Sequence, residues 1–439
     1  MWVDVGTALP VRPSSWRGDV LGRPVTRFDQ HSQDHAQNWE ASYRRLREES
    51  PIAWSNAHGG YWILSRYEDV ATAVRDYATF ASGRFAGNDG ALAGGIAIPS
   101  LPFRLIPTET DPPDWERMRR LLNPVLGPTT VQRFRRSAQE NTGRLIDNHI
   151  ETGRMDLVKD LANPLPTMIT LELLGLPASE WRRFAEPFNL FPSSPPGSQN
   201  RARAEHGMAW IYEQIQQATV DRRIDPRDDL ISRAANANSG EDALTEDEII
   251  DLLFNVIGAG LDTSTSLSSN AFWHLHRHHG DRDRLIDDPT LLREATEEFL
   301  RFYTPIQTQA RTATRNCRIG DYEIAAGDRV LLALSGANRD PAAFEDPEKF
   351  LLDRFPNRHL AFGMGIHRCV GSHLARLMFE AMVSTVLHRM PDYVVDETRA
   401  QRYPDIGTIL GWTTMPVTFS PGSVLDGELS AAKASPLTP

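Results

Sequence analysis

The amino-acid sequence predicts a mainly α-helical protein with a small β region, and three observations support this class. Helical spacing of apolar side chains recurs through most of residues 129–302. Strand-like pieces are short and gather in two stretches, residues 52–65 and 307–333. No internal repeat or linker separates autonomous halves, so we expect one large domain over residues 36–420.

Local signals place the elements in chain order. Asp111, which precedes two prolines, is expected to cap the N-terminus of a helix. Thr245 and Glu248 form a capping-box pattern at the start of the longest expected helix. Helices are expected at about 37–49, 67–75, 111–120, 129–152, 156–175, 178–190, 200–223, 245–278, 282–288, 290–302 and 371–389, and strands at 52–55, 60–65, 307–314, 317–324 and 329–333.

Four segments lack a regular pattern. Residues 1–35 are rich in Pro, Gly, Asp and Arg and predict an arm over the surface, whereas residues 421–439 predict a disordered tail. The glycine-rich stretch 82–105 is too long for a simple connector, so we expect a mobile lid or binding loop. The Pro/Ser/Gly break at 191–198 predicts a hinge between two helices that cover a pocket.

Composition and charge exclude several classes of protein. The 439 residues carry a net charge of −11, which argues against general nucleic-acid binding because phosphate affinity needs a basic surface. Cys317 and Cys369 lie far apart and make no disulfide framework, which fits a reducing compartment. The N-terminus lacks a signal-peptide pattern, and no run approaches the ~20 apolar residues of a membrane span. We therefore expect a cytoplasmic protein with no membrane or nucleic-acid partner.

The most informative stretch is Phe362-Gly-Met-Gly-Ile-His-Arg-Cys-Val-Gly371. Its glycines allow the backbone to turn tightly and to approach a flat partner closely. A helix is expected just behind Cys369, and a helix N-terminus together with loop N–H groups favours a thiolate. No second cysteine or histidine stands at zinc spacing, so one sulfur suits a single axial bond to iron. The alternative is a buried structural cysteine in a glycine-rich turn.

This stretch matches every fixed position of F-G-x-G-x-H-x-C-x-G and resembles the haem-thiolate loop of the cytochrome P-450 monooxygenases. The resemblance covers about residues 35–420. It implies a triangular helical prism with a long central helix over haem b, Cys369 as the axial iron ligand, and Phe362 and Gly363 beside the cofactor. The members without an N-terminal membrane helix are soluble bacterial enzymes. Within these, IPTETDPP at 106–113 and GLDT at 260–263 are similar to the camphor-hydroxylase-like subgroup.

A second motif lies inside the longest expected helix, where Ala259-Gly-Leu-Asp-Thr-Ser264 is rich in mediocre helix formers. From the residues alone, the Thr263 hydroxyl could simply bond its own i−4 carbonyl. The segment also resembles the family's A-G-x-(D/E)-T oxygen-binding motif. That resemblance implies that Thr263 bonds iron-bound dioxygen and that Asp262 relays protons to it. Gly260 is expected to leave space for dioxygen, and Ala259 to face the haem.

Two further sets of residues match the family. Glu298 and Arg301 (E-x-x-R) and Arg354, in the PEKFLLDRF segment, correspond to a buried structural triad; the alternative for the first pair is an exposed ion pair of small value. Haem propionates need cationic or N–H partners. The positions that match the family's propionate contacts are Trp115, Arg119, Arg311 and His367, with tryptophan standing where many relatives carry histidine.

The substrate pocket is expected on the face of the long helix that carries Asn255, Ala259 and Thr263. The other positions that resemble substrate contacts are Phe103, Leu105, Gln307 and Ile409. Such a pocket is mainly apolar with two amides, and an unpaired buried amide costs ~1–3 kcal/mol. We therefore expect a compact apolar substrate, terpenoid or aromatic, with at least one hydrogen-bonding oxygen. The alternative is that each amide bonds backbone or water.

The resemblance implies a haem-thiolate monooxygenase that hydroxylates or epoxidises its substrate with dioxygen and two electrons. No redox domain is fused to the chain, so we expect a separate iron–sulfur ferredoxin and its NAD(P)H-dependent reductase, docking at Arg117, Arg120 and Arg368. One rival is another haem-thiolate chemistry, such as peroxide-driven oxidation, coupling or desaturation. A second is a non-enzymatic haem sensor, which would need no Asp–Thr pair.

Overall fold

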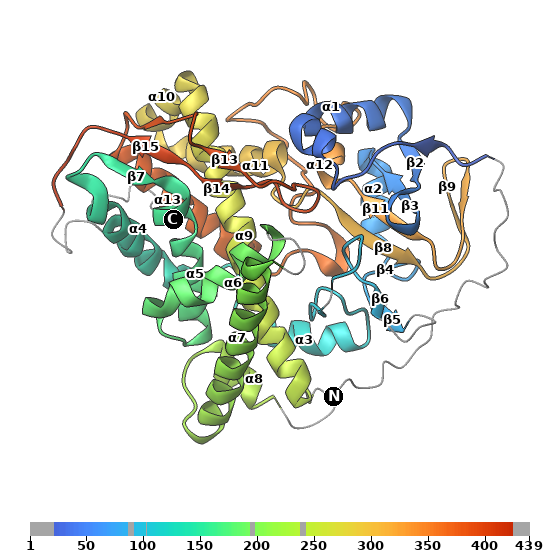
Figure 1. The fold of residues 1–439 in the computed structure, drawn as a ribbon, viewed down its shortest axis with the longest axis horizontal. Helices are drawn as coiled ribbons and strands as arrows, with labels where there is room; N and C mark the ends of the chain where they lie inside the picture. The colour runs from blue at the N-terminus through green and yellow to red at the C-terminus, as the bar shows by residue number, and fades with distance from the viewer. Residues whose placement is uncertain (1–21, 87–91, 102, 194–197, 238–242, 425–439) are drawn as a thin grey trace.

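The computed structural model describes residues 22–86, 92–101, 103–193, 198–237 and 243–424. Helices dominate and strands form a small second region (Figure 1), so the predicted fold class is confirmed. The main helices are α1 (Gln33–Glu49), α2 (Tyr67–Arg75), α3 (Asp114–Leu122), α4 (Arg135–Ile150), α5 (Pro164–Leu174), α6 (Trp181–Ser193), α7 (Gln199–Ile224), α8 (Leu230–Ala235), α9 (Glu246–Arg277), α10 (His279–Asp287), α11 (Leu292–Tyr303), α12 (Leu334–Ala337) and α13 (Ser372–Arg389).

The strands lie mostly on one side of the molecule. A six-stranded sheet has the order β1-β2-β3-β11-β8-β4, in which β3 runs antiparallel to β2 and parallel to β11. Smaller sheets are β5–β6, β9–β10, β13–β14 and β12-β15-β7. Their bounds are β1 (Val25–Thr26), β2 (Ile52–Ser55), β3 (Tyr61–Leu64), β4 (Phe80–Ala81), β5 (Arg84–Ala86), β6 (Leu92–Gly94), β7 (Arg154–Asp156), β8 (Gln309–Ala313), β9 (Cys317–Ile319), β10 (Tyr322–Ile324), β11 (Arg329–Leu332), β12 (Val394–Val395), β13 (Gln401–Arg402), β14 (Trp412–Thr414) and β15 (Pro416–Thr418).

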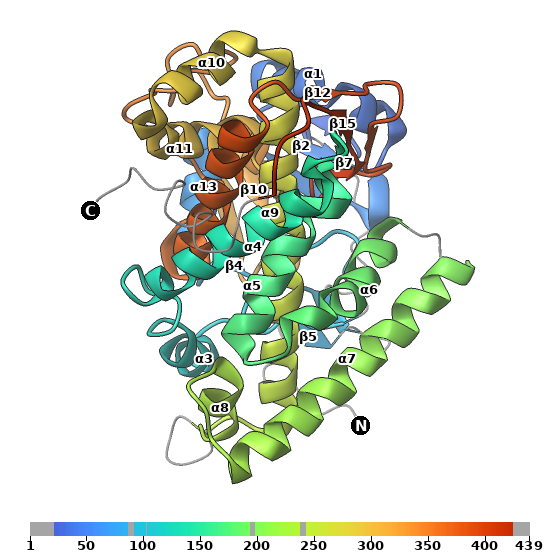
Figure 2. The same cartoon turned by 90° about the vertical axis from the view of Figure 1, so that its left-hand side faces the viewer.

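Helix α9 runs through the middle of the molecule, between the helical part and the strands (Figure 1). Its N-terminus is fixed by the predicted capping box, in which Thr245 Oγ1 accepts from the Glu248 N–H and Glu248 accepts from the Thr245 N–H. The central turns of α9 are largely buried, with α5 and α13 packed against them and α7 crossing the outside (Figure 2). A helix buried on most sides in this way is a rigid base for a site.

Some elements differ from the sequence prediction. The stretch 156–175, expected as one helix, contains the end of β7, a π-helical turn (Leu157–Ala162) and α5. Asp156 explains the break, because its carboxylate accepts from the Val158 and Lys159 N–H groups and starts a new helical segment there. The short helix α8 and the C-terminal strands β12 to β15 were not predicted, since each is too brief to show a period.

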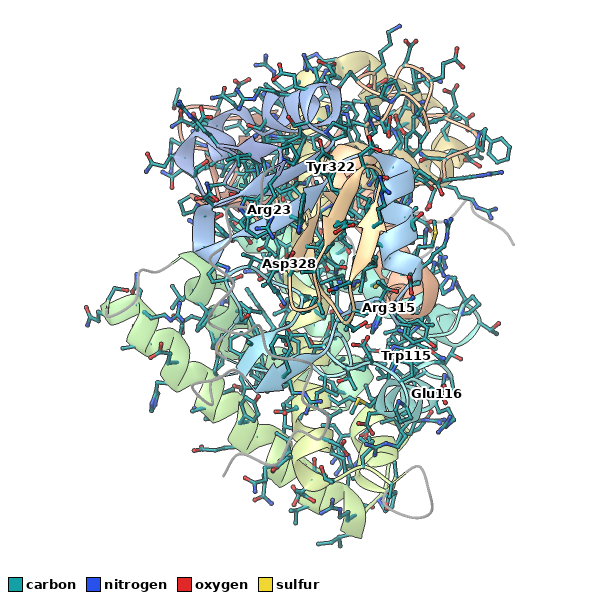
Figure 3. All side chains as sticks on the ribbon, turned by 90° about the vertical axis from the view of Figure 1, so that its right-hand side faces the viewer. Arg23, Trp115, Glu116, Arg315, Tyr322 and Asp328 are labelled. Atoms are coloured by element: carbon teal, nitrogen blue, oxygen red, sulfur yellow. The ribbon has the colours of Figure 1, made fainter. Side chains whose placement is uncertain are left out.

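The described part of the predicted N-terminal arm packs on the sheet. Strand β1 pairs with β2, the Arg23 guanidinium lies 3.8 Å from the Trp54 ring centroid, and Arg23 reaches within 3.5 Å of Asp328 (Figure 3). Residues 1–21 and most of the predicted tail, 425–439, lie outside the described residues. Within the part of the chain that the structure describes, every helix falls short of the length and apolarity that a bilayer crossing requires.

Candidate active site

The cysteine loop joins the end of an irregular segment to the start of α13. Gly363 and Gly365 have φ of +65° and +67°, which side chains with a Cβ rarely adopt. The Cys369 N–H donates to the Phe362 carbonyl oxygen at 2.8 Å and closes the loop. A Cβ on Gly365 would lie 3.3 Å from the Val74 carbonyl oxygen at the end of α2. The loop is therefore narrow, closed by its own backbone and packed against α2.

The Cys369 side chain is surface-accessible although protein surrounds it closely. Burial raises the pKa of its thiol, while the Gly371 N–H and the guanidinium groups of Arg119, Arg368 and Arg376 act in the opposite direction. A side chain can be both accessible and closely surrounded by protein if its sulfur faces a hollow inside the fold. The surrounding protein alone favours the thiol, so a metal cation bound at the sulfur would be needed to hold a thiolate.

The long helix contributes a second accessible position. Ala259 lies in the middle of α9 and is exposed although the residues around it are buried or partly buried, which indicates that it too borders a hollow. One turn later, the Thr263 hydroxyl donates to the Ala259 carbonyl oxygen at 2.9 Å. The bond to the i−4 carbonyl therefore forms, and it leaves the Thr263 oxygen with lone pairs that can accept a hydrogen bond.

Asp262 stands out among the carboxylates of α9. Its Oδ1 is buried and has no hydrogen-bond partner among the described residues, and burial raises its pKa to about 7. A carboxyl that is partly protonated at neutral pH can both give and take a proton, as proton transfer in catalysis requires.

The structure corrects the role expected for Gly260. A Cβ added at this position would lie 2.6 Å from Thr170 Oγ1 on α5. Gly260 therefore permits the close packing of α5 against α9, and its missing side chain does not clear space beside Ala259.

The predicted propionate contacts come from α3, β8 and the cysteine loop, and Figure 3 labels one of them, Trp115. The Trp115 and His367 rings meet edge to face, 6.1 Å apart, and the Arg119 guanidinium lies 5.5 Å from the Trp115 ring centroid. Arg119 Nε is buried and has no hydrogen-bond partner within the described part of the chain. Arg311 is buried, and burial lowers its pKa to about 10 although Asp111 opposes this. Its nearest acceptors are the Ala310 carbonyl at 2.8 Å and Gln309 at 3.4 Å, which leaves donors for an anion.

Asp111 belongs to this cluster, and its predicted capping role is wrong. Helix α3 begins at Asp114 with Pro113 at the cap position. The Asp111 carboxylate instead accepts from the Gly83 N–H at 2.7 Å and lies 2.9 Å from His367 Nε2. Two prolines after Asp111 carry no N–H to be capped, so the carboxylate is free to bind elsewhere. It orients His367 and joins the 82–105 loop to the cysteine loop.

Behind the cysteine loop, Glu298 is fully buried and accepts from two arginines. Arg301 donates to it at 2.7 and 2.8 Å, and Arg354 donates at 3.1 Å to each oxygen. The remaining donors of both guanidinium groups bind backbone carbonyls, among them Asn338 and Glu345. This arrangement ties α11 to the segment that leads into the cysteine loop.

The sequence did not indicate a second ionic group beside this network. Arg376 on α13 donates to Glu297 at 2.6 and 2.7 Å, and His359 lies 3.0 Å from the same carboxylate. Burial alone would raise the pKa of Glu297, but these two partners lower it to about 2. The Arg376 guanidinium also covers the Phe362 ring at 4.5 Å. In the sequence, the only hint of this ionic group is that Arg376 lies on the helix that follows Cys369.

The predicted lid at 82–105 is pinned by a buried ion pair. Arg84 donates to Glu109 at 2.6 and 3.1 Å with both side chains almost fully buried. Glu109 also accepts from the N–H groups of Ile96 and Leu105, each at 3.0 Å. The described part of this loop therefore has a defined structure, with β5 and β6 paired. Residues 87–91 and 102 lie outside the described residues.

The predicted substrate contacts come together in part. Phe103 meets Phe191 at 5.3 Å and Phe254 at 6.2 Å between ring centroids, and Leu105 follows it in the same loop. The sequence does not reveal this aromatic cluster, because its members lie on three separate elements. On the other side, an isolated bridge joins Ile306 to Ile409.

Both predicted amides use their NH₂ groups within the protein. Asn255 donates to the Ile106 carbonyl at 2.8 Å and to Thr108 at 3.1 Å. Gln307 is fully buried and donates to the Tyr303 and Thr304 carbonyls at the end of α11, while its Oε1 has no partner. One alternative from the sequence was that each amide bonds the backbone or water. For the NH₂ groups of both residues, bonding to the backbone is what the structure shows.

Together, the fold and the site define a haem-thiolate protein. A cysteine on a narrow loop and an alanine in mid-helix are both accessible within the fold, and guanidinium groups with donors to spare lie near the cysteine loop. These residues fit haem, because the sulfur can bind iron while Arg119, Arg311 and their neighbours bind propionates.

Comparisons with known proteins agree. The model of the family Cytochrome P-450 matches residues 179–399. The polyketide biosynthesis cytochrome P-450 PksS of Bacillus subtilis (strain 168) is 30% identical over 374 residues, 83% of this chain and 91% of that protein. The mycinamicin IV hydroxylase/epoxidase of Micromonospora griseorubida is 30% identical over 371 residues, 81% of this chain and 89% of that protein.

A solved structure points to the same family. The Mycobacterium marinum cytochrome P-450 CYP268A2 in complex with pseudoionone superposes with a TM-score of 0.81 at 26% identity, covering 90% of this chain and 99% of that chain. The chain belongs to the cytochrome P-450 family and is a monooxygenase with a haem-thiolate cofactor.

Proposed function

We propose that this protein binds haem b through Cys369 and inserts one oxygen atom from dioxygen into a compact, mainly apolar small molecule, by hydroxylation or epoxidation. The observation that carries the proposal is that Cys369 and Ala259 are both accessible although protein surrounds them, with Thr263 one turn from Ala259 on α9. We assign the catalytic domain to residues 36–420 and place the protein in the cytoplasm.

When bound, haem supplies the iron that activates dioxygen with electron density from the thiolate. The side chains have separate tasks. Arg119, Arg311, Trp115 and His367 bind and orient the propionates, with His367 positioned by Asp111. Asp262 holds a proton at its carboxyl, and the Thr263 oxygen accepts a hydrogen bond beside the substrate. An Asp–Thr pair in these states favours the use of dioxygen over peroxide.

The pocket supports a substrate of the terpenoid or aromatic kind. Phe103 and its aromatic partners give apolar walls, and Asn255 keeps its Oδ1 as an acceptor on the Ala259 and Thr263 face, because its NH₂ group donates to Ile106 and Thr108. Gln307 is fully buried and does not border the pocket. Since the Asn255 NH₂ group is used internally, a substrate oxygen that pairs with Asn255 must donate, so a hydroxyl is favoured over a ketone. The relatives reported above act on or bind quite different molecules and do not by themselves select a substrate.

The haem assignment is tested by the carbon-monoxide spectrum of the reduced protein. We expect the red-shifted Soret band of a thiolate ligand, lost in Cys369→Ser and kept in the control Cys317→Ser. A band without the shift in the parent protein would refute Cys369 as the ligand. Activity that a ferredoxin and reductase cannot support, but peroxide can, would favour the peroxide-driven alternative.

The substrate class is tested by spin-state titration with matched ligands. Three molecules of one carbon skeleton, as alcohol, ketone and hydrocarbon, are compared in the parent and in Asn255→Leu. We expect the alcohol to bind most tightly, by about tenfold for one buried hydrogen bond, and to lose this preference in the variant. Equal affinities of alcohol and hydrocarbon would contradict the hydroxyl preference.

A further inference from the structure

The short segment before α1 lies between two parts of the chain that are far apart in sequence, the 82–105 loop and the turn at residues 403–411 that joins β13 to β14. His31 in this segment contacts both. Its Nδ1 lies 2.7 Å from a carboxylate oxygen of Asp405 in the turn, and its Nε2 lies 2.8 Å from the Ile98 carbonyl oxygen in the loop. One imidazole ring therefore joins the loop to the turn.

Both partners of the His31 ring are hydrogen-bond acceptors. The partner in the loop is a backbone carbonyl oxygen. Burial would raise the pKa of Asp405, but its hydrogen bonds with His31 and the Gly407 N–H lower it, so Asp405 is a carboxylate. A neutral imidazole has one N–H and one acceptor nitrogen, and it can donate to only one of the two partners. Only the imidazolium, which carries a proton on each nitrogen, donates to both.

The groups that face the His31 ring are compatible with a cation. Burial lowers the pKa of His31, but the hydrogen bond and charge of Asp405, the loop carbonyl and the Asp29 carboxylate together raise it above its ordinary value. Two other histidines stand nearby. The His58 ring meets the His31 ring edge to face at 5.4 Å, and its Nε2 lies 3.0 Å from Asp29. Burial lowers the pKa of His35 to about 4, so His35 is neutral near pH 7.

The loop and the turn are each anchored by a contact that does not involve His31. Gln30 donates to the Ile98 carbonyl oxygen at 2.8 Å, and this oxygen has a lone pair for each of its two donors. In the turn, Thr308 donates to the Gly407 carbonyl at 2.6 Å. Losing the charge on His31 would therefore weaken the link between the two segments without unfolding either one.

We infer that the doubly protonated His31 is a positioning residue, which holds the 82–105 loop and the 403–411 turn against each other and so tightens substrate binding. The inference rests on the proposed function, because the expected substrate contacts include Phe103 in the loop and Ile409 in the turn.

The link depends on pH in one direction. As pH rises through the pKa of His31, the Nδ1–H is kept, since a hydrogen bond to a carboxylate is the stronger of the two. The proton is lost from Nε2 and taken by water, which reaches the side chain because it is 24% exposed. Nε2 then turns a lone pair toward the Ile98 oxygen, and the two atoms repel. The link is present at low pH and lost at high pH.

The experiment compares four haem-loaded proteins between about pH 6 and about pH 9, a range in which histidines titrate. His31→Gln cannot carry the charge. Asp405→Asn removes the carboxylate but keeps an oxygen for the Gly407 N–H. His58→Gln is the matched control beside the parent, because His58 also pairs with an aspartate of this segment, while its hydrogen bond joins neither the loop nor the turn.

Two measurements are made on each protein. The dissociation constant of 1-adamantanol, a compact alcohol that does not titrate in this range, is obtained from the spin-state shift. Hydrogen exchange of residues 93–101 and 403–411 is followed without ligand. Each value is expressed relative to His31→Gln at the same pH, which cancels intrinsic exchange and the titration of other groups such as Asp262.

We expect the parent to bind 1-adamantanol roughly three- to tenfold more tightly than His31→Gln at low pH, as for one charge-assisted hydrogen bond, and equally at high pH. Asp405→Asn should lose this advantage at a lower pH than the parent, because its neighbours hold the imidazolium proton less firmly. Exchange of both segments should follow the same order, and His58→Gln should match the parent. A side chain that only fills space would not move the midpoint.

Three results would overturn the inference: equal binding by the parent and His31→Gln at low pH, an advantage of the parent that is the same at every pH, or an equal loss in His58→Gln. If 1-adamantanol shifts the spin state of none of the proteins, the proposed substrate class fails, and exchange decides on the link. The link then stands if the slower exchange of the parent disappears at high pH, and it falls if the difference persists or never appears.

Discussion

Three buried carboxylates in this protein differ in what surrounds them, and that difference separates structure from chemistry. Glu298 and Glu109 each bind arginine side chains and backbone N–H groups, so their charge is fully compensated. Asp262 has no such partner, and its pKa is raised to about 7. A compensated carboxylate stabilises one arrangement of the chain. An uncompensated buried carboxylate destabilises the fold, and its raised pKa lets it take part in proton transfer near neutral pH.

Glu298→Gln should lower the free energy of unfolding by about 3–5 kcal/mol, because Arg301 and Arg354 would stay buried without a carboxylate. Urea unfolding of the haem-loaded protein measures the change. Glu294→Gln on the same helix is the control, since Glu294 is exposed. A loss under 1 kcal/mol in Glu298→Gln would show that the backbone carbonyls around the arginines compensate their charge unaided.

Asp262→Asn should make the protein more stable at high pH. A carboxyl whose pKa is raised in the folded state contributes stability below its ordinary pKa, and this contribution is lost as pH rises through about 7. Asparagine does not titrate. We expect parent and variant to be equally stable below about pH 4, and the variant to gain as the pH rises from about 4 to about 7, by up to about 4 kcal/mol at pH 8. Thermal unfolding across this range tests it, and a difference independent of pH would contradict the raised pKa.

At the scale of elements, the sequence predicts what depends on neighbours in the chain. Thr245 and Glu248 define the start of α9 because both capping bonds are local. The Asp111 prediction failed for the opposite reason: its partners, Gly83 and His367, come from distant segments. Likewise, glycine content in 82–105 predicts mobility, but the pairing of Arg84 with Glu109 depends on a contact that spacing does not reveal.

Glu109 therefore decides how firmly the loop above the pocket is held. In Glu109→Gln, Arg84 loses its partner, and two loop N–H groups lose a charged acceptor. We expect hydrogen exchange of residues 93–108 to accelerate by roughly a hundredfold, equivalent to about 3 kcal/mol of local opening. Exchange in α9 should not change. The exposed Glu116→Gln on α3 is the control, and equal exchange rates in Glu109→Gln and the parent would show that other contacts hold the loop.

At the scale of the whole molecule, charge is unevenly distributed. The chain is acidic, at −11, yet exposed arginines surround the cysteine loop. Arg368 lies next to Cys369, and Arg75 borders Gly365. Arg117, expected to belong to this set, is neutralised instead, because it donates to Glu248 at 2.7 Å and to Asp114 at 2.9 Å. It joins α3 to the start of α9. Arg120 also lies 3.7 Å from a carboxylate oxygen of Glu116, so the docking surface shifts to Arg75 and Arg368.

We expect an acidic ferredoxin to dock on this surface, which lies nearer the sulfur than any other exposed basic set described above. Arg368→Glu should slow the reduction of the haem by roughly tenfold at low salt, because charge attraction sets the association rate. The difference should shrink as ionic strength rises toward 0.5 M, where the screening length falls to about 4 Å. Arg318→Glu, in the β9–β10 hairpin, reverses an exposed charge away from the loop and should reduce at the parent rate. Stopped-flow reduction measures all three proteins, and equal salt dependence for Arg368→Glu and Arg318→Glu would place the donor elsewhere.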